Sequence, residues 1–290
     1  MAQMPKPKLI LMKIAGTTTD RKFTETLLPY AENRMKDFLT EDWADGLSKH
    51  WADELTVDLI AYMRKEADLD PDAPAIKNQN QNEGRLLKET IAYVNYLFTE
   101  MGYTCKGRQM LYPLIWYAGY NSGRLKSHVF PDVADAIYCW HKMGIPVCVY
   151  SGGNAIANKM IFTFSQEGGN LNKFIRKYLD VNVYGRKDDD KSYDKIAAEF
   201  GIKTKEMLFL TDDVAEGAAA RDARVRCLIV RRPNNAEVTQ EQLTSIGCDA
   251  VSSFLDVHFD MDACPVSALS AVSAVSTLSV CVSCESLLPE

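Results

Sequence analysis

Residues 9–19 of the chain read LILMKIAGTTT. The apolar run at the start of this stretch is short and ends near a glycine and three threonines, which is typical of a buried β-strand that leads into a tight turn. Alternate residues of a strand project to the same face, so the side chains of Lys13 and Ala15 are predicted to lie together where the strand ends. The rest of the fold can be placed around this strand.

Further short apolar runs bounded by turn residues follow later in the chain, with helical patterns between the later ones. They are Pro146–Tyr150, Val181–Tyr184, Met207–Thr211 and Arg226–Val230. Strands that alternate with helices are typical of a parallel sheet with helical crossovers. The sequence therefore predicts an α/β fold built on a doubly wound parallel sheet.

The interval 23–127 has no good strand and instead repeats apolar residues at spacings of three and four, which is the period of an amphipathic helix. We predict that it forms a helical cap inserted into an α/β core of residues 8–22 and 128–257. From about residue 258 to 290 the composition turns to Ser, Ala and Val without an amphipathic period. This tail is predicted to be disordered.

Composition narrows the classes of partner. The 290 residues are 47% hydrophobic, which is enough for a substantial core, and 39 acidic residues outnumber 33 basic ones. This balance argues against a nucleic-acid binder, because phosphate backbones attract basic surfaces.

The apolar run that ends at Lys13 is too short for a secretory leader or a membrane span. We expect a monomer in the cytosol, with the nucleus as an alternative compartment, and small-molecule or protein partners.

Two segments could hold a phosphate group. Ser151-Gly152-Gly153 follows a predicted strand and opens a helical pattern, so it offers a hydroxyl and backbone N–H groups to an anion. Taken alone, this segment could equally be a tight turn. Lys187 could neutralise a phosphate, but it lies in the charged run 186–191, and such runs are usually solvated.

Acidic residues follow the predicted strand Met207–Thr211. Asp212, Asp213 and Glu216 come at the carboxyl end of that strand and at the start of an alanine-rich helical pattern. Carboxylates in this place can anchor Mg²⁺ or can cap and charge-match the helix. The residues alone leave both roles open.

The order and local sequences of these segments resemble the enolase-phosphatase E1 family, the acireductone synthases of methionine salvage, in the haloacid-dehalogenase-like superfamily. The resemblance covers about residues 9–256 and rests on Gly16-Thr17-Thr18-Thr19, Gly185-Arg186-Lys187 and Ser192-Tyr193-Asp194-Lys195-Ile196-Ala197. It implies a phosphate site formed by Ser151, Gly152 and Lys187, and a magnesium ligand in Asp212. Gly152 departs from the family, which commonly has a second serine there.

The main departure lies in the first loop. The family's loop reads Asp-Ile-Glu-Gly-Thr-Thr-Thr, in which the first carboxylate attacks phosphorus and binds Mg²⁺ and the second handles a proton. Lys13 and Ala15 stand at these two positions. An ammonium repels a divalent cation and cannot form an acyl phosphate, and a methyl group transfers no proton. No catalytic residue is therefore predicted to be intact, and Mg²⁺ binding is in doubt.

Two interpretations of Lys13 follow. It could extend from the strand end while a nucleophile lies elsewhere, or its ammonium could take the place of the metal and neutralise Asp212 directly, leaving an anion pocket between Lys187 and Ser151. Our leading hypothesis for function is an enolase-phosphatase E1-like protein whose phosphatase activity is lost or severely impaired, with a non-catalytic binding or regulatory role.

Two alternatives stay open at this point. One is an active Mg²⁺-dependent acireductone synthase that converts 2,3-diketo-5-methylthiopentyl phosphate to the acireductone and phosphate. The other is a structural interaction protein with an unidentified protein partner. Whether the chain is an enzyme is thus left undecided by the sequence.

Overall fold

The computed structural model describes residues 4–35, 53–77, 83–101 and 105–260. The chain divides into a compact unit, Pro7–Val257, and a second unit formed by residues 1–6 and 258–290. In the second unit Met4 pairs with Phe259 through a parallel bridge. Most of the predicted tail, residues 261–290, lies outside the described residues. None of the helices in the described ranges is long and apolar enough to cross a membrane.

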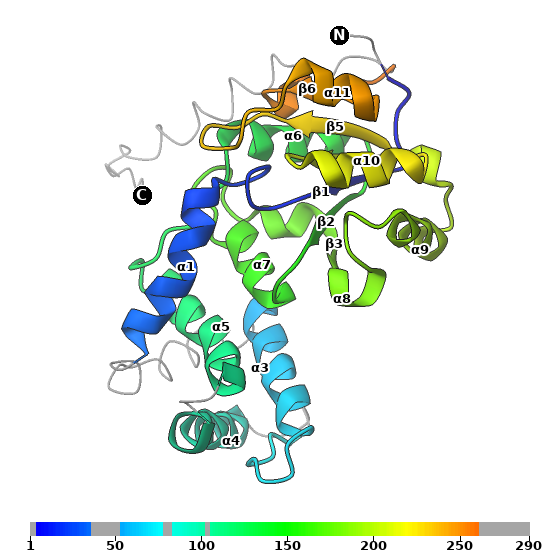
Figure 1. Ribbon diagram of the computed structural model, residues 1–290. Helices are drawn as coiled ribbons and strands as arrows, with labels where there is room; N and C mark the ends of the chain where they lie inside the picture. The colour runs from blue at the N-terminus through cyan, green and yellow to red at the C-terminus, as the bar shows by residue number, and fades with distance from the viewer. Residues whose placement is uncertain (1–3, 36–52, 78–82, 102–104, 261–290) are drawn as a thin grey trace, which may run out of the picture. The chain divides into compact units, whose positions relative to one another are not determined.

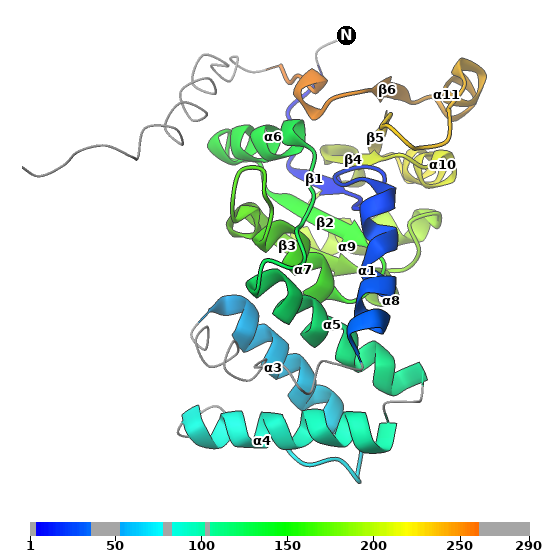
Figure 2. The same ribbon diagram turned by 90° about the vertical axis from the view of Figure 1, so that its left-hand side faces the viewer.

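Within the described residues of the larger unit, six parallel strands form one sheet in the order β3-β2-β1-β4-β5-β6 (Figure 1; all six strands are labelled in Figure 2). The strands are β1 (Leu9–Met12), β2 (Val147–Ser151), β3 (Ile175–Asp180), β4 (Met207–Thr211), β5 (Arg226–Val230) and β6 (Asp249–Val251). This sheet confirms the predicted α/β doubly wound class. The strand order reverses between β1 and β4, and open sheets of this kind bind ligands outside the carboxyl ends of the strands at such a point.

One predicted strand is wrong. Val181–Tyr184 forms a short helix, α8, because the Asp180 carboxylate accepts a hydrogen bond from the Asn182 N–H at 2.8 Å and caps the turn. The true strand, β3, is at the edge of the sheet and carries exposed charged residues that hide its pattern. The opposite edge strand, β6, was also missed, because it is only three residues long and is partly exposed at the edge of the sheet.

The two faces of the sheet are covered by different helices. Leu9 and Leu11 point to one face, where they join a buried cluster with residues of α9 (Asp190–Phe200), α10 (Val214–Asp222) and α11 (Gln240–Ile246). Ile10 and Met12 are equally buried and alternate to the other face. Helices α6 (Pro131–Lys142) and α7 (Ala155–Thr163) contact β2 and β3 and lie outside that cluster.

The described part of the interval between β1 and α6 is helical, as predicted. It contains α1 (Arg21–Arg34), α3 (Glu54–Ala67), α4 (Glu83–Tyr96), a π-helical turn Leu97–Met101 and α5 (Cys105–Asn121). Helix α1 packs on α5, and both α3 and α5 contact α7 of the core. Figure 2 shows α4 on the side of α3 and α5 away from the sheet. The domain limits given above stay a prediction.

An ion-pair group ties α3 to α7. Lys159 of α7 places its Nζ atom 2.9 Å from Glu54 Oε1 and also pairs with Asp58, so it links the start of α3 to α7. A hydrogen bond between the hydroxyls of Thr56 and Tyr117 joins α3 to α5. These contacts hold α3 and α5 beside the carboxyl end of β2.

Candidate functional site

The loop after β1 is tightly wound around one carbonyl group. The N–H groups of Thr17, Thr18 and Thr19 all donate to the Ile14 carbonyl oxygen, at 3.1, 3.0 and 3.2 Å. Gly16 makes this possible, because its φ of 76° lies in the left-handed region that side chains disfavour. The three threonines are fully buried. The loop is therefore rigid, and it fixes the side chains just before it.

We expect Gly16→Ala to destabilise the fold by about 2 kcal/mol or more, since the new Cβ would add left-handed strain and crowd Arg21 Nε at 2.8 Å and the Asp212 carboxylate. Urea unfolding of the variant measures this. Gly144→Ala is the matched control, because its φ is 68° and open space surrounds its Cβ position. Equal losses in the two variants would show that backbone strain, and not the crowded site, sets the effect.

The ammonium of Lys13 lies between two carboxylates. Its Nζ atom is 3.0 Å from Asp212 Oδ1 and 3.4 Å from Glu216 Oε1. These side chains are nearly dry, with 11% of Lys13 and 1% of Asp212 exposed. A buried charge is tolerated when it is paired, so each group holds the others in place. The hypothesised contact between Lys13 and Asp212 is present.

Two members of this cluster were not predicted as site residues. Arg21, at the start of α1, donates from Nε to Asp212 Oδ2 at 3.1 Å and forms a second, shorter contact through its terminal nitrogen. This hydrogen bond raises the pKa of Arg21. Asp213 and Glu216 were candidates to cap or charge-match α10. Asp213 is the cap and accepts from the Ala215 N–H at 2.8 Å, and Glu216 is the acid in the first turn of the helix. The Glu216 side chain is buried and turns inward.

Glu216 connects the lysines. Its Oε1 atom lies 3.4 Å from Lys13 Nζ and 3.1 Å from Lys187 Nζ, and the Thr211 hydroxyl donates to its other oxygen. The periodicity of α10 could have indicated an inward position for Glu216, because Ala219 and Ala220, three and four residues later, face the core. No sequence signal pointed to Arg21.

Two tyrosine hydroxyls hold the backbone of the loop that carries Lys187. The Tyr193 hydroxyl donates to the Lys187 carbonyl and the Tyr150 hydroxyl donates to the Gly185 carbonyl, both at 2.6 Å. Burial raises the pKa of Tyr150 to about 12, so its hydroxyl stays a donor. Only 15% of the Lys187 side chain is exposed, so it does not lie on a solvated face.

The Ser151 segment leads from β2 into α7. Asn154 caps this helix by accepting from the Ile156 N–H at 2.8 Å, and Gly153 has a φ of 87°. The first N–H groups of a helix are aimed away from it, toward the preceding loop. Ser151 and Gly152 therefore stand beside a group of donors, which is what an anion requires.

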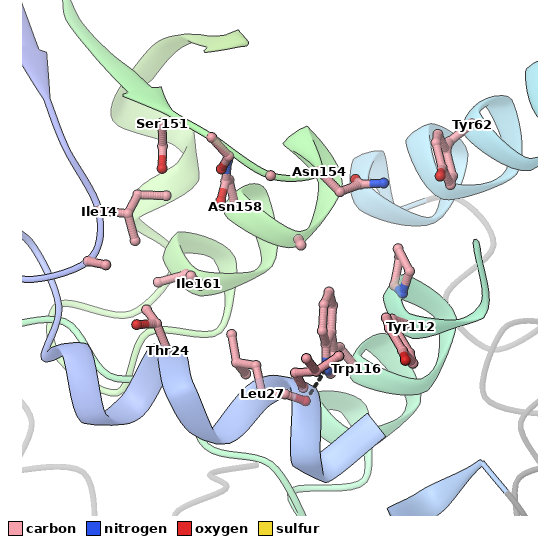
Figure 3. A pocket seen from close by; sticks show the side chains of 16 residues that line it. Ile14, Thr24, Leu27, Tyr62, Tyr112, Trp116, Ser151, Asn154, Asn158 and Ile161 are labelled. Carbon is pink, nitrogen blue, oxygen red and sulfur yellow. Dashed lines mark hydrogen bonds between the residues drawn. The ribbon is translucent and has the colours of Figure 1, made fainter. Parts of the chain in front are cut away.

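A cavity of about 570 Å³ lies between this segment and the cap helices. In Figure 3, Trp116 and Leu27 face Ser151 and Asn158 across the opening, and the Trp116 Nε1–H donates to the Leu27 carbonyl at 2.7 Å. None of the 16 residues that line the cavity carries a charge. They are Ile14, Ala15, Thr24, Leu27, Leu28, Tyr62, Tyr112, Pro113, Trp116, Ser151, Gly152, Gly153, Asn154, Ala157, Asn158 and Ile161.

The predicted site residues fall into two neighbouring groups. Lys13, Asp212 and Lys187 belong to the charged cluster, where Glu216 joins them. Ala15 and Ser151 line the uncharged cavity. Gly152 lines this cavity and also a smaller one, of about 240 Å³, that Lys187 and Glu216 line. The two groups therefore meet at Gly152.

The donor set at this edge does not fit Mg²⁺. Asp212 Oδ1 already accepts from Thr17 at 3.2 Å and pairs with Lys13, while Oδ2 is held by Arg21. Mg²⁺ takes oxygen ligands at about 2.0–2.1 Å in a near-ideal octahedron. Nowhere in the described ranges do three or more His, Cys, Asp or Glu side chains gather so that they could hold a metal ion.

Comparison with solved structures supports the fold. A crystal structure of the UTR4 protein from Saccharomyces cerevisiae matches with a TM-score of 0.57 and 24% sequence identity, over 86% of this chain and 99% of that one. A sequence model of haloacid dehalogenase-like hydrolases matches residues 44–224, which begin after the Lys13 loop.

Curated relatives match a larger part of the chain. An enolase-phosphatase E1 of Drosophila simulans is 34% identical over 253 residues, which are 87% of this chain and 93% of that protein. An enolase-phosphatase E1 of Xenopus tropicalis is 33% identical over 88% of this chain and 96% of its own length. The chain therefore belongs to the enolase-phosphatase E1 family, within the haloacid dehalogenase-like hydrolases.

Proposed function

We propose that this member of the family binds small phosphate esters without hydrolysing them and so has a binding or regulatory role. The observation that carries the proposal is the contact of Lys13 Nζ with Asp212 Oδ1 at 3.0 Å. By the motif resemblance, Lys13 stands where the family has its first carboxylate, so the proposal takes this cation to fill the place of the carboxylate and its metal.

The remaining carboxylates are poor nucleophiles. Attack on phosphorus requires an oxygen lone pair that is free and can reach the substrate. Asp212 is 1% exposed and is held by Lys13, Thr17 and Arg21. Glu216 is 10% exposed and is held by Lys13, Lys187 and Thr211. Phosphoryl transfer through either side chain would first require breaking these pairs.

An anion can still be attracted to the same edge. Lys13, Arg21 and Lys187 supply three positive charges, and they contact the two carboxylates of Asp212 and Glu216. The third nearby acid, Asp213, is held by the N–H groups of α10. The N–H groups at the start of α7 and the Ser151 hydroxyl add donors. The uncharged cavity beyond Gly152 suits the neutral body of such an ester.

We expect Lys187→Ala to weaken the binding of n-butyl phosphate about tenfold, because a charge-assisted contact is lost and Glu216 is left less neutralised. Titration calorimetry measures the affinity, and quenching of Trp116, which lines the cavity, reports it independently. Arg85→Ala is the matched control: this cation is 59% exposed, pairs with Glu89 on α4 and lines neither cavity, so its loss should leave the affinity unchanged.

The same titration discriminates the rival functions. Release of inorganic phosphate by the wild-type protein would show a working hydrolase and contradict the proposal. Absence of binding for the ester and for inorganic phosphate would favour a role in protein interaction alone. Binding without release is the result that we expect.

A further inference from the structure

Every carboxylate oxygen of Asp212 and Glu216 already has a partner. Asp212 Oδ1 contacts Lys13 and Thr17, and its Oδ2 accepts from Arg21. Glu216 Oε1 contacts Lys13 at 3.4 Å and Lys187 at 3.1 Å, and the Thr211 hydroxyl donates to its Oε2. Lys13 is the residue that touches both carboxylates, so its ammonium is at the centre of the negative charge.

A divalent ion would have to displace that ammonium. The Lys13 ammonium cannot swing into nearby water, because the side chain is only 11% exposed and extends from the end of a central strand. Two cations close together repel, and a nearly dry environment strengthens the repulsion. Ala15 adds no oxygen ligand in exchange. The energetic balance therefore favours the ammonium over the metal.

We infer that Lys13 is a built-in replacement for the divalent cation and that ligand binding at this site is independent of Mg²⁺. The inference rests on the proposed function. It adds that the positive charge that attracts the anion comes from the Lys13 side chain and not from a bound metal ion. The other acids nearby have partners of their own: Asp213 accepts from the N–H groups of α10, and Asp188 pairs with Arg186.

Metal binding tests the inference without reference to any ligand. When Mn²⁺ is titrated into the wild-type protein, we expect the electron paramagnetic resonance signal of free Mn²⁺ to be undiminished. Lys13→Asp should create a site that removes one Mn²⁺ per chain from the signal, and Asp212→Asn in that background should abolish it. The control is Lys8→Asp, at an exposed lysine just before the same strand, which should bind no Mn²⁺.

Lys13→Gln serves where Lys13→Asp does not fold. This variant is neutral, keeps much of the side-chain volume and removes the repulsion, so it should show weak Mn²⁺ uptake that the wild type lacks. Uptake of one Mn²⁺ by the wild-type protein, lost in Asp212→Asn, would overturn the inference.

Ligand binding supplies the second test. The affinity for n-butyl phosphate should be the same in excess EDTA and in millimolar Mg²⁺, and Lys13→Gln should weaken it about tenfold. Binding that requires Mg²⁺ would overturn the inference and leave the proposed function standing. Absence of binding in both conditions would overturn the proposed function, and the Mn²⁺ titration would still decide whether Lys13 replaces the metal.

Discussion

Lys13→Asp combined with Ala15→Glu should release inorganic phosphate from 2,3-diketo-5-methylthiopentyl phosphate at least about a hundredfold faster than the wild-type protein in the presence of Mg²⁺. The two substitutions restore the carboxylates that the family resemblance places there. Lys13 contacts Asp212, so the carboxylate introduced at position 13 would lie in the charged cluster. Ala15 lines the cavity, so the carboxylate introduced at position 15 would face the space proposed for the uncharged part of the ester. Phosphate release and loss of the diketo substrate are measured together.

Two further variants, one single and one triple, control this experiment. On the proposed function, Ala15→Glu alone should release no phosphate, because position 13 still lacks a carboxylate and Lys13 still pairs with Asp212. Asp212→Asn added to the double variant should abolish its activity. A wild-type rate as high as that of the double variant would show that another residue attacks phosphorus and that the interpretation of Lys13 is wrong.

Lys13→Met should lower the free energy of unfolding by about 3–5 kcal/mol, the usual effect of removing one partner from a buried ion pair. The substitution keeps the volume but leaves Asp212 and Glu216, 1% and 10% exposed, with less compensation. Such a loss is a large part of the stability of an ordinary domain. Urea unfolding followed by circular dichroism measures it.

The matched control is Lys8→Met. Lys8 pairs with Glu206 at 2.8 Å, but its side chain is 61% exposed, so its loss should change the stability by at most about 1 kcal/mol. A double-mutant cycle of Lys13→Met with Asp212→Asn isolates the pair, and we expect a coupling of about 1–3 kcal/mol. A coupling near zero would mean that Arg21 alone neutralises Asp212.

Central strands were predictable and edge strands were not. β1 and β4 lie inside the sheet, are buried along their length and show as continuous apolar runs. β3 includes the exposed residues Arg176 and Lys177, because an edge strand faces water on one side. The apolar run Val181–Tyr184 gave a stronger signal than the true strand and was misassigned.

The residues of the candidate site were also predictable only in part. The closeness of Lys13 and Asp212 followed from elementary topology, since the carboxyl ends of neighbouring parallel strands meet at one edge. The part played by Arg21 did not follow, because it depends on the path of the loop between β1 and α1. Glu216 was assigned to its own helix, and only the packed structure shows that it turns toward Lys187.

The cluster around Asp212 also bears on the lifetime of the folded state. It joins Thr17 to Asp212 across 195 positions of the chain and Arg21 to Asp212 across 191. Contacts between segments this far apart in the sequence form only after a long loop has closed. Where such contacts are absent from the folding transition state, their loss speeds unfolding and leaves the folding rate nearly unchanged. We therefore expect loss of the cluster to shorten the lifetime of the native state more than it slows folding.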